Sequence, residues 1–151
     1  MQMIPIKALI RDGSWLNCTV EKGQTCRIRI LKFERLDCAE VDSPEKADPV
    51  QEGAVRWIME LEVVNTSKVY IGCSDLEYPM RIVDSDGFQF KRRSDDHLCL
   101  HSKFAKISGL KSFFGQSLMP KIKVRGAILF DLPDEDTEYA LTLKNGTIEE
   151  I

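Results

Sequence analysis

The chain has 151 residues, of which 43% are hydrophobic and 30% are charged, and its net charge at pH 7 is −3. This composition excludes a largely disordered chain, and the length fits a single β-sandwich domain spanning residues 1–151. The small excess of acids excludes a global basic field, so we expect no nucleic-acid partner and no attraction to an anionic membrane.

Residues 4 to 10, IPIKALI, open the chain with a pattern that we interpret as a strand, with Pro5 suited to a sheet edge. The opening holds no apolar run long enough for a signal peptide, and no segment approaches the roughly 20 apolar residues of a membrane helix. The five cysteines are scattered, which favours reduced thiols over a disulfide framework or a zinc-ligand pair. Together these observations predict a cytoplasmic protein.

The next strand signal contains a change of phase. Cys26, Ile28 and Ile30 alternate with polar residues, and then Leu31 and Phe33 continue in the opposite phase. A slip of one residue inside a strand predicts a β-bulge. Residues 37 to 53 follow with six acids and one lysine, and they predict a long acidic loop.

The clearest strand signal lies in residues 54 to 65. One set of alternating positions is apolar, and the other carries Arg56, Glu60 and Glu62; the apolar set is Val55, Trp57, Met59, Leu61 and Val63. This alternation predicts a strand with one dry face and one face in water.

The stretch RIVDSDGFQF, residues 81 to 90, allows two interpretations. Asp84 and Asp86 before Gly87 suggest a calcium loop, but aligning Gly87 with the glycine of an EF-hand puts the hydrocarbon side chain of Ile82 at the first ligand position. Asp-Gly between alternating apolar runs is instead a hairpin signal, because glycine accepts a positive φ. We therefore expect a turn with Ile82 and Phe88 facing the core, followed by solvated edge charges at residues 91 to 93.

Residues 95 to 101, DDHLCLH, hold the only clustered set of soft metal ligands in the sequence. If the segment is extended, His97, Cys99 and His101 share one face, and imidazole and thiolate groups are the ligands of zinc. A third residue in one row of a strand seldom reaches the same ion. The alternative interpretation is two exposed histidines beside a structural cysteine.

Residues 101 to 117 form a phenylalanine-rich connection with apolar residues at three- to four-residue spacing. This spacing predicts one short helix or turn near residues 102–114 that covers the open end of a sandwich. Phe113 and Phe114 are adjacent and cannot easily both enter one core, so one of them is a candidate contact for a partner protein. The alternative is that both cap the core.

Two more strands are predicted in residues 121 to 133 and 139 to 143, the first with Ile122, Val124, Ile128 and Phe130 on one face. The chain then has seven or eight short strands and no alternation of strands with helices. This order predicts an all-β fold, an antiparallel immunoglobulin-like β-sandwich.

The later strands also carry a set of recurrent turn motifs. These are an N-x-S turn at Asn65, a D-S-D-G hairpin at residues 84 to 87, and Leu118, Pro120, Gly126, Phe130 and Pro133 around the following strand. Over residues 55 to 143 the chain thereby resembles bacterial immunoglobulin-like sandwich domains of the immunoprotective extracellular protein type. Lys121 stands where that family usually has a turn glycine. The resemblance implies a sandwich without a shared catalytic site, and it implies export or lipid anchoring, which the opening of this chain does not suggest.

No motif of catalysis is present, whether a G-x-S-x-G elbow, a P-loop or a G-x-G-x-x-G turn, so we expect no enzyme and no cofactor. The function predicted is a non-enzymatic protein-interaction or accessory module, a monomer or weak homo-oligomer that binds another protein through loops or a sheet edge. The alternative is a metal-binding or metal-sensing protein that uses residues 95 to 101. A third is a structural subunit of a larger assembly.

Overall fold

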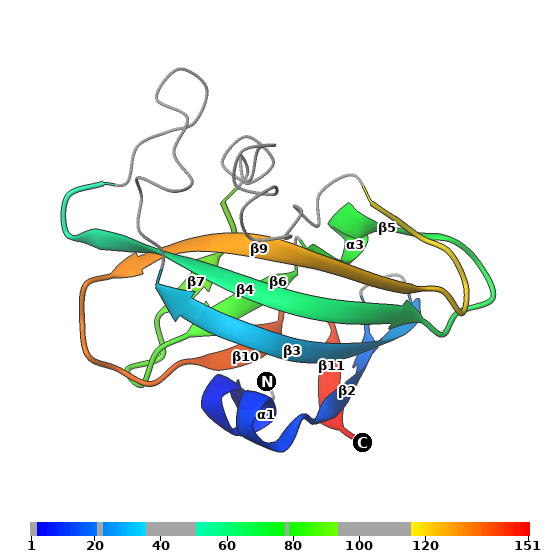
Figure 1. Ribbon diagram of the computed structural model, residues 1–151, viewed down its shortest axis with the longest axis horizontal. Helices are drawn as coiled ribbons and strands as arrows, with labels where there is room; N and C mark the ends of the chain where they lie inside the picture. The colour runs from blue at the N-terminus through cyan, green and yellow to red at the C-terminus, as the bar shows by residue number, and fades with distance from the viewer. Residues whose placement is uncertain (1–2, 21–22, 36–50, 78, 94–115) are drawn as a thin grey trace.

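The structure is a computed structural model that describes residues 3–20, 23–35, 51–77, 79–93 and 116–151. Its strands form two main antiparallel sheets, which pack face to face as a β-sandwich (Figure 1). The five-stranded sheet has the order β11 (Thr147–Glu150), β2 (Trp15–Thr19), β3 (Thr25–Arg35), β4 (Ala54–Asn65) and β9 (Lys123–Pro133). The four-stranded sheet has the order β1 (Ile4–Pro5), β10 (Ala140–Leu143), β6 (Met80–Val83) and β7 (Gln89–Lys91). A short pair joins β5 (Ile71–Gly72) to β8 (Ser117–Leu118).

The core lies between the two main sheets and follows the predicted alternation of β4. Met59, Leu61 and Val63 are buried there, and the same phase continues on β9 with Ile128 and Phe130. The predicted bulge is confirmed, because the pairing of β3 with β4 shifts register between Ile30 and Lys32. The prediction of an all-β sandwich with antiparallel sheets is therefore confirmed.

Two cysteines contribute to this core from neighbouring strands. Cys18 on β2 and Cys26 on β3 are directly opposite each other, and both are buried free thiols. A hydrogen bond with Cys26 and then burial raise the pKa of the Cys18 thiol above its usual value. At neutral pH the Cys18 side chain therefore behaves as a small hydrophobic group, as the sequence predicted.

The start of the chain differs from the prediction. Only β1 is a strand in residues 4 to 10, and helix α1 (Ile6–Asp12) follows it and ends at Gly13, whose φ of 61° is left-handed. Ile6 and Leu9 are three residues apart, so the helix directs both into the core. The described residues contain eleven strands rather than seven or eight, because several strands are only two to four residues long. No described helix, α1 and α3 (Cys73–Glu77) included, has the length and apolarity to cross a membrane.

The turn at residues 84 to 87 is confirmed, with one correction. The Asp84 carboxylate accepts hydrogen bonds from the backbone N–H groups of Asp86 at 3.0 Å and Phe88 at 2.9 Å, and Gly87 has a φ of 90°. The prediction that Phe88 faces the core is wrong, because its side chain is 66% exposed. Strand β7 begins only after Phe88, so Phe90 pairs with Ile82 and packs against the core instead.

The side chain of Asn65 joins three segments at the end of β4. It is fully buried, and its amide donates to the carbonyl oxygens of Val69 at 2.8 Å and Leu118 at 2.7 Å. Its amide oxygen accepts a hydrogen bond from the backbone N–H of Ser67 at 2.8 Å, and its backbone oxygen accepts one from Lys121 at 2.9 Å. The N-x-S motif therefore holds the turn after β4 against the turn before β9.

Lys121 adopts the left-handed backbone conformation, with a φ of 67°, at the position where the resembled family usually has glycine. We expect Lys121→Gly to raise the free energy of unfolding by about 0.5–1 kcal/mol, because this conformation strains a lysine more than the added freedom of glycine stabilises the unfolded chain. Urea denaturation measures the change. Lys144→Gly is the control, since Lys144 is an exposed turn lysine without a positive φ, and equal effects of the two substitutions would contradict the prediction.

Strand β9 lies at one edge of the five-stranded sheet, and other segments of the chain bind to that edge. The backbone N–H of Arg93 donates to the carbonyl oxygen of Leu129 at 2.8 Å. The side-chain amide of Gln116 donates to the backbone carbonyl oxygen of Arg125 at 3.3 Å. The prediction of solvated charges at residues 91 to 93 is therefore wrong for Arg92 and Arg93. Arg92 is buried, and Arg93 pairs with an aspartate of β9.

Candidate functional site

The outer face of the five-stranded sheet, which points away from the core, carries a network of ion pairs. Glu62 on β4 accepts hydrogen bonds from Arg29 on β3, with 3.0 Å between Nε and Oε1, and pairs with Lys123 on β9 at 3.1 Å. Glu60 pairs with Arg125 in the same way. The prediction that this face lies in water is wrong for both glutamates, because the long cationic side chains beside them leave the glutamates buried.

The two cations next to Glu62 determine its charge state. Burial alone would raise the pKa of this carboxyl, but the hydrogen bonds and charges of Arg29 and Lys123 together lower the pKa below its usual value. Glu62 is therefore a carboxylate at neutral pH and holds β3, β4 and β9 together. Arg29 and Lys123 are therefore both already paired with an anion of the protein itself, Glu62.

A second charged group lies nearer the other end of the same face. The Asp131 carboxylate on β9 accepts a hydrogen bond from Arg56 on β4 at 3.1 Å and pairs with Arg93 through its other oxygen. The Arg56 side chain is completely buried, although the alternation of β4 predicted that it faces water. Because the Arg56 side chain is fully buried and that of Arg93 is mostly buried, this cluster contributes to stability rather than to binding.

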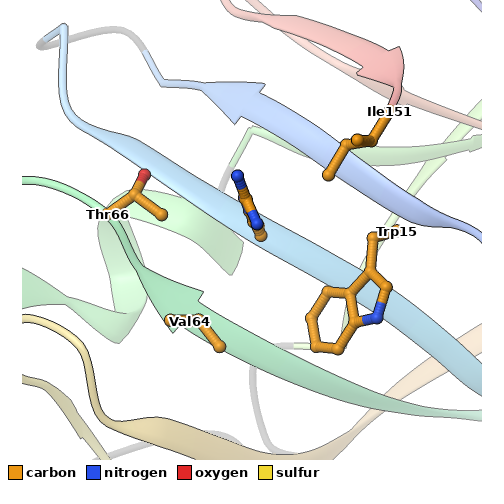
Figure 2. Close-up of a pocket in the computed structure, with 5 residues that line it drawn as sticks. Trp15, Val64, Thr66 and Ile151 are labelled. Carbon is orange, nitrogen blue, oxygen red and sulfur yellow. The ribbon is translucent and has the colours of Figure 1, made fainter.

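A depression of about 380 Å³ lies on the outer face near the hairpin of β2 and β3. It is lined by residues from four separate parts of the chain, namely Trp15, Arg27, Val64, Thr66 and Ile151. Figure 2 shows these side chains around the surface of β3, with the indole of Trp15 on one side and Thr66 on the other. The size falls within the range of small-ligand sites, roughly 300–1,000 Å³.

The register of the strands explains why these residues meet. Arg27 pairs with Val64 across β3 and β4, and Trp15 pairs with Arg29 one row further along β3. Paired residues of antiparallel strands share a face, so all four point outward. Ile151 follows β11 and donates its backbone N–H to the carbonyl oxygen of Trp15 at 3.2 Å, which places it in the same row as the indole.

Arg27 differs from the other arginines of the outer face. Arg29 and Arg125 are bound to glutamates, whereas no carboxylate of the described residues pairs with Arg27. The guanidinium of Arg29 lies 4.8 Å from the centroid of the Trp15 ring, so a cation–π contact holds the indole in place. The depression therefore combines a fixed aromatic wall with an exposed guanidinium to which no described carboxylate is bound.

A larger depression, of about 470 Å³, lies on the four-stranded sheet between β6 and the turn after β10. It is lined by Arg81, Gln89, Lys144 and Asn145, with Leu143 and Gly146. Arg81 already donates to the carbonyl oxygen of Met80 at 2.9 Å, and burial lowers its pKa. Because its half-buried cation, Arg81, has an internal partner, this depression is a weaker candidate than the one around Arg27.

The site residues predicted from the sequence are His97, Cys99, His101, Phe113 and Phe114, and all of them lie outside the described residues. The same holds for the short helix near residues 102–114 and for residues 37 to 50 of the acidic loop. These predictions stay predictions. The part of the chain that the structure describes contains no group of three or more histidine, cysteine or acidic side chains arranged to hold a metal ion.

The sequence reasoning did not identify Trp15 or Arg27. Their positions in the alternation could have indicated them. Each lies in a strand in which every second residue is apolar and buried, and each occupies one of the positions between, which point outward. The neighbourhood of the half-buried Trp15 and the exposed Arg27 on the outer face is visible only once β2 and β3 are aligned.

Comparison with known proteins identifies solved structures with a similar fold. No protein-family model matches the chain, and no curated protein sequence does. A conserved hypothetical protein from Bacillus anthracis is similar with a TM-score of 0.55 and 14% identity, over 90% of this chain and 96% of that one. A protein described as a "putative lipoprotein (ycdA)" from Bacillus subtilis has a TM-score of 0.52 and 12% identity, over 83% of this chain and 36% of that one.

An uncharacterised β-sandwich protein from Clostridium difficile matches with a TM-score of 0.47 and 18% identity, over 83% of this chain and 85% of that one. At these identities the similarity concerns the fold alone. The chain thus shares its fold with two Bacillus proteins whose descriptions give no activity.

Proposed function

We propose that this chain is a non-enzymatic protein-interaction or accessory module of the immunoglobulin-like sandwich type. It binds another protein through the outer face of the five-stranded sheet, centred on the depression around Arg27. The observation that carries this proposal is the guanidinium of Arg27, which pairs with no carboxylate of the described residues and lies among Trp15, Val64 and Ile151.

The composition of the depression supports a protein partner. Tryptophan and arginine are enriched among the residues that dominate protein–protein binding energy, and such residues lie at the centre of a patch with a polar rim. Here Trp15, Val64 and Ile151, the last of them 64% exposed, line the depression together with Arg27. The exposed polar residues Asn17, Thr19 and Thr25 lie beside it on β2 and β3. None of the five lining residues is a general base or an activated nucleophile, so the site suits binding.

We also propose that the module works in the cytoplasm. The support is the pair of free thiols, Cys18 and Cys26, which face each other across β2 and β3 without a disulfide. Fractionation of the native cells checks this location, and recovery of the protein from a membrane or culture medium would contradict it.

The experiment begins with a photo-crosslinking residue at Thr66, which is exposed and lines the depression. The captured partner is identified, purified and titrated against the intact chain. We expect Arg27→Ala and Trp15→Ala each to weaken this binding about tenfold or more, since loss of a central contact costs over about 1.4 kcal/mol.

Lys91→Ala is the matched control, because Lys91 is an exposed cation on β7 of the other sheet. Its affinity for the partner should equal that of the unchanged chain. If Arg27→Ala and Trp15→Ala also bind the partner with unchanged affinity, the outer face is not the binding surface and the proposal fails.

A further inference from the structure

We propose that the depression around Arg27 recognises a carboxylate joined to an apolar group, presented by a partner protein as an acidic side chain next to an aliphatic or aromatic one. This inference rests on the proposed function, because it names the chemistry that the same surface binds. It follows from the charge, the walls and the rigidity of the site.

The charge of the site calls for an anion. On the outer face, Glu62 is shared by Arg29 and Lys123, and Glu60 neutralises Arg125, but no described carboxylate reaches Arg27. A guanidinium presents its N–H groups in a planar fork that matches the two oxygens of a carboxylate. An incoming carboxylate therefore completes, from outside, the pairing that Arg29, Lys123 and Arg125 obtain from the glutamates of β4.

The walls of the site call for an apolar group beside that anion. Trp15 and Ile151 lie on the β2 side of Arg27, and Val64 lies on the β4 side. These side chains offer hydrocarbon and ring surface within a volume of about 380 Å³. A bare, strongly hydrated anion would leave this surface in water, whereas an attached aliphatic or aromatic group covers it.

The site is already in a fixed arrangement before a ligand arrives. Arg29 stacks over Trp15 with 4.8 Å between the guanidinium carbon and the ring centroid, and Glu62 holds Arg29. On the opposite side the hydroxyl of Thr66 donates to that of Thr25 at 2.9 Å. Because these neighbours are fixed, binding costs little further ordering of the walls.

Two acids lie near Arg27, and one of them, Glu62, is diagonally opposite it across β3 and β4 but is bound by Arg29 and Lys123. Glu149 on β11 is in the same row as Arg27, with Asn17 on β2 between them. Two strand spacings separate them, about 10 Å, which is about one Debye length at 0.1 M salt. Glu149 thus weakens the attraction for an anion at Arg27 without neutralising it, and Glu149→Gln should strengthen binding of the carboxylate.

The probe for the test is N-acetylphenylalanine, which joins a carboxylate to an aromatic group, and its comparison is the uncharged N-acetylphenylalanine amide. The reporter is the indole N–H signal of Trp15 in NMR titrations of the intact chain. The chain has only two tryptophans, so Trp15→Phe assigns the signal and Trp57 serves as an internal check of folding. We expect a saturable shift of the Trp15 signal with the acid and binding of the amide that is roughly tenfold weaker.

The variants separate the role of Arg27 from a general effect of charge. Arg27→Gln should reduce the affinity for the acid to that for the amide, Arg27→Lys should keep part of the difference, and Lys91→Gln should change nothing. Equal binding of acid and amide, or unchanged binding of the acid by Arg27→Gln, overturns the inference even if a protein partner still depends on Trp15. Carboxylate binding without any partner that depends on Arg27 overturns the assignment to a protein segment and leaves a small carboxylate as the ligand.

Discussion

Replacing Asp131 by asparagine should lower the free energy of unfolding by about 3 kcal/mol or more. Asp131 is the carboxylate that binds both Arg56 and Arg93, and the Arg56 side chain is completely buried. Asparagine keeps the shape of the side chain but removes its charge, so two arginines on the shielded part of the outer face lose their bound anion. Buried charges that lose a partner are costly, because neither water nor a counter-ion replaces it. Urea denaturation followed by tryptophan fluorescence measures the loss.

The control for Asp131→Asn is Asp134→Asn, directly after the end of β9. Asp134 pairs with Arg35, but the two side chains are 63% and 50% exposed. An ion pair in water contributes little, so we expect a change within about 0.5 kcal/mol. If Asp134→Asn costs as much as Asp131→Asn, burial of the ion pair does not determine its contribution to stability.

Asn65→Ala should destabilise the fold by about 3 kcal/mol, because a buried hydrogen-bonding group left without a partner costs about 1–3 kcal/mol, and the bond to Leu118 is buried while those to Val69 and Ser67 are partly buried. The substitution leaves the carbonyl oxygens of Val69 and Leu118 and the N–H of Ser67 without the bonds that Asn65 supplies. At this chain length the midpoint of thermal unfolding should fall by about 6–12 °C. Circular dichroism during heating measures this shift.

Asn17→Ala provides the comparison for Asn65→Ala. Asn17 lies on β2 of the same sheet but is exposed on the outer face, so its loss should change the unfolding midpoint by no more than about 2 °C. Asn65→Asp separates the two donated bonds from the accepted one, because aspartate keeps an acceptor for the N–H of Ser67 and lacks the N–H groups that donate to Val69 and Leu118. A midpoint for Asn65→Asp equal to that of the unchanged chain would show that the two donated bonds contribute nothing.

The alternation of apolar and polar residues predicted the strands and the direction of their side chains, but not which outward side chains are buried by neighbouring strands. Alternation assigned Leu61 and Val63 to the core and Glu62 to the opposite face, and the structure agrees, because side-chain direction in a strand depends on its own backbone alone. The exposure of Glu62 depends on Arg29 and Lys123, which come from two other strands. The same reason explains Arg56, which points outward and is nevertheless buried.

Short segments at element boundaries were predicted less well. The apolar residues of positions 4 to 10 fit both the two-residue period of a strand and the spacing of a helix. The helix forms because it buries both Ile6 and Leu9 in the core. Phe88 fits the phase of the following strand, but β7 begins one residue later. In both cases the competing structures differ by tertiary contacts that a single sequence does not display.

The candidate site could not be predicted from local patterns at all. Trp15, Arg27, Val64 and Ile151 are single residues spread from one end of the chain to the other, and only the order β11, β2, β3 and β4 brings them together. Arg27 is distinctive because no carboxylate in the described part of the chain pairs with it, and that property depends on the positions of all the acids around it.

The hydrogen bonds at the edge of β9 have a consequence for how the protein can associate. A sheet recruits a further strand through outward-facing backbone groups, which is also how sandwiches polymerise into fibres. Arg93 and Gln116 occupy two of the outward carbonyl oxygens of the sheet's long outer strand, those of Leu129 and Arg125. A further strand could pair with β9 at these points only after this chain breaks its own hydrogen bonds there. Binding to the outer face of the sheet requires no such loss, so it costs less free energy than binding to this edge.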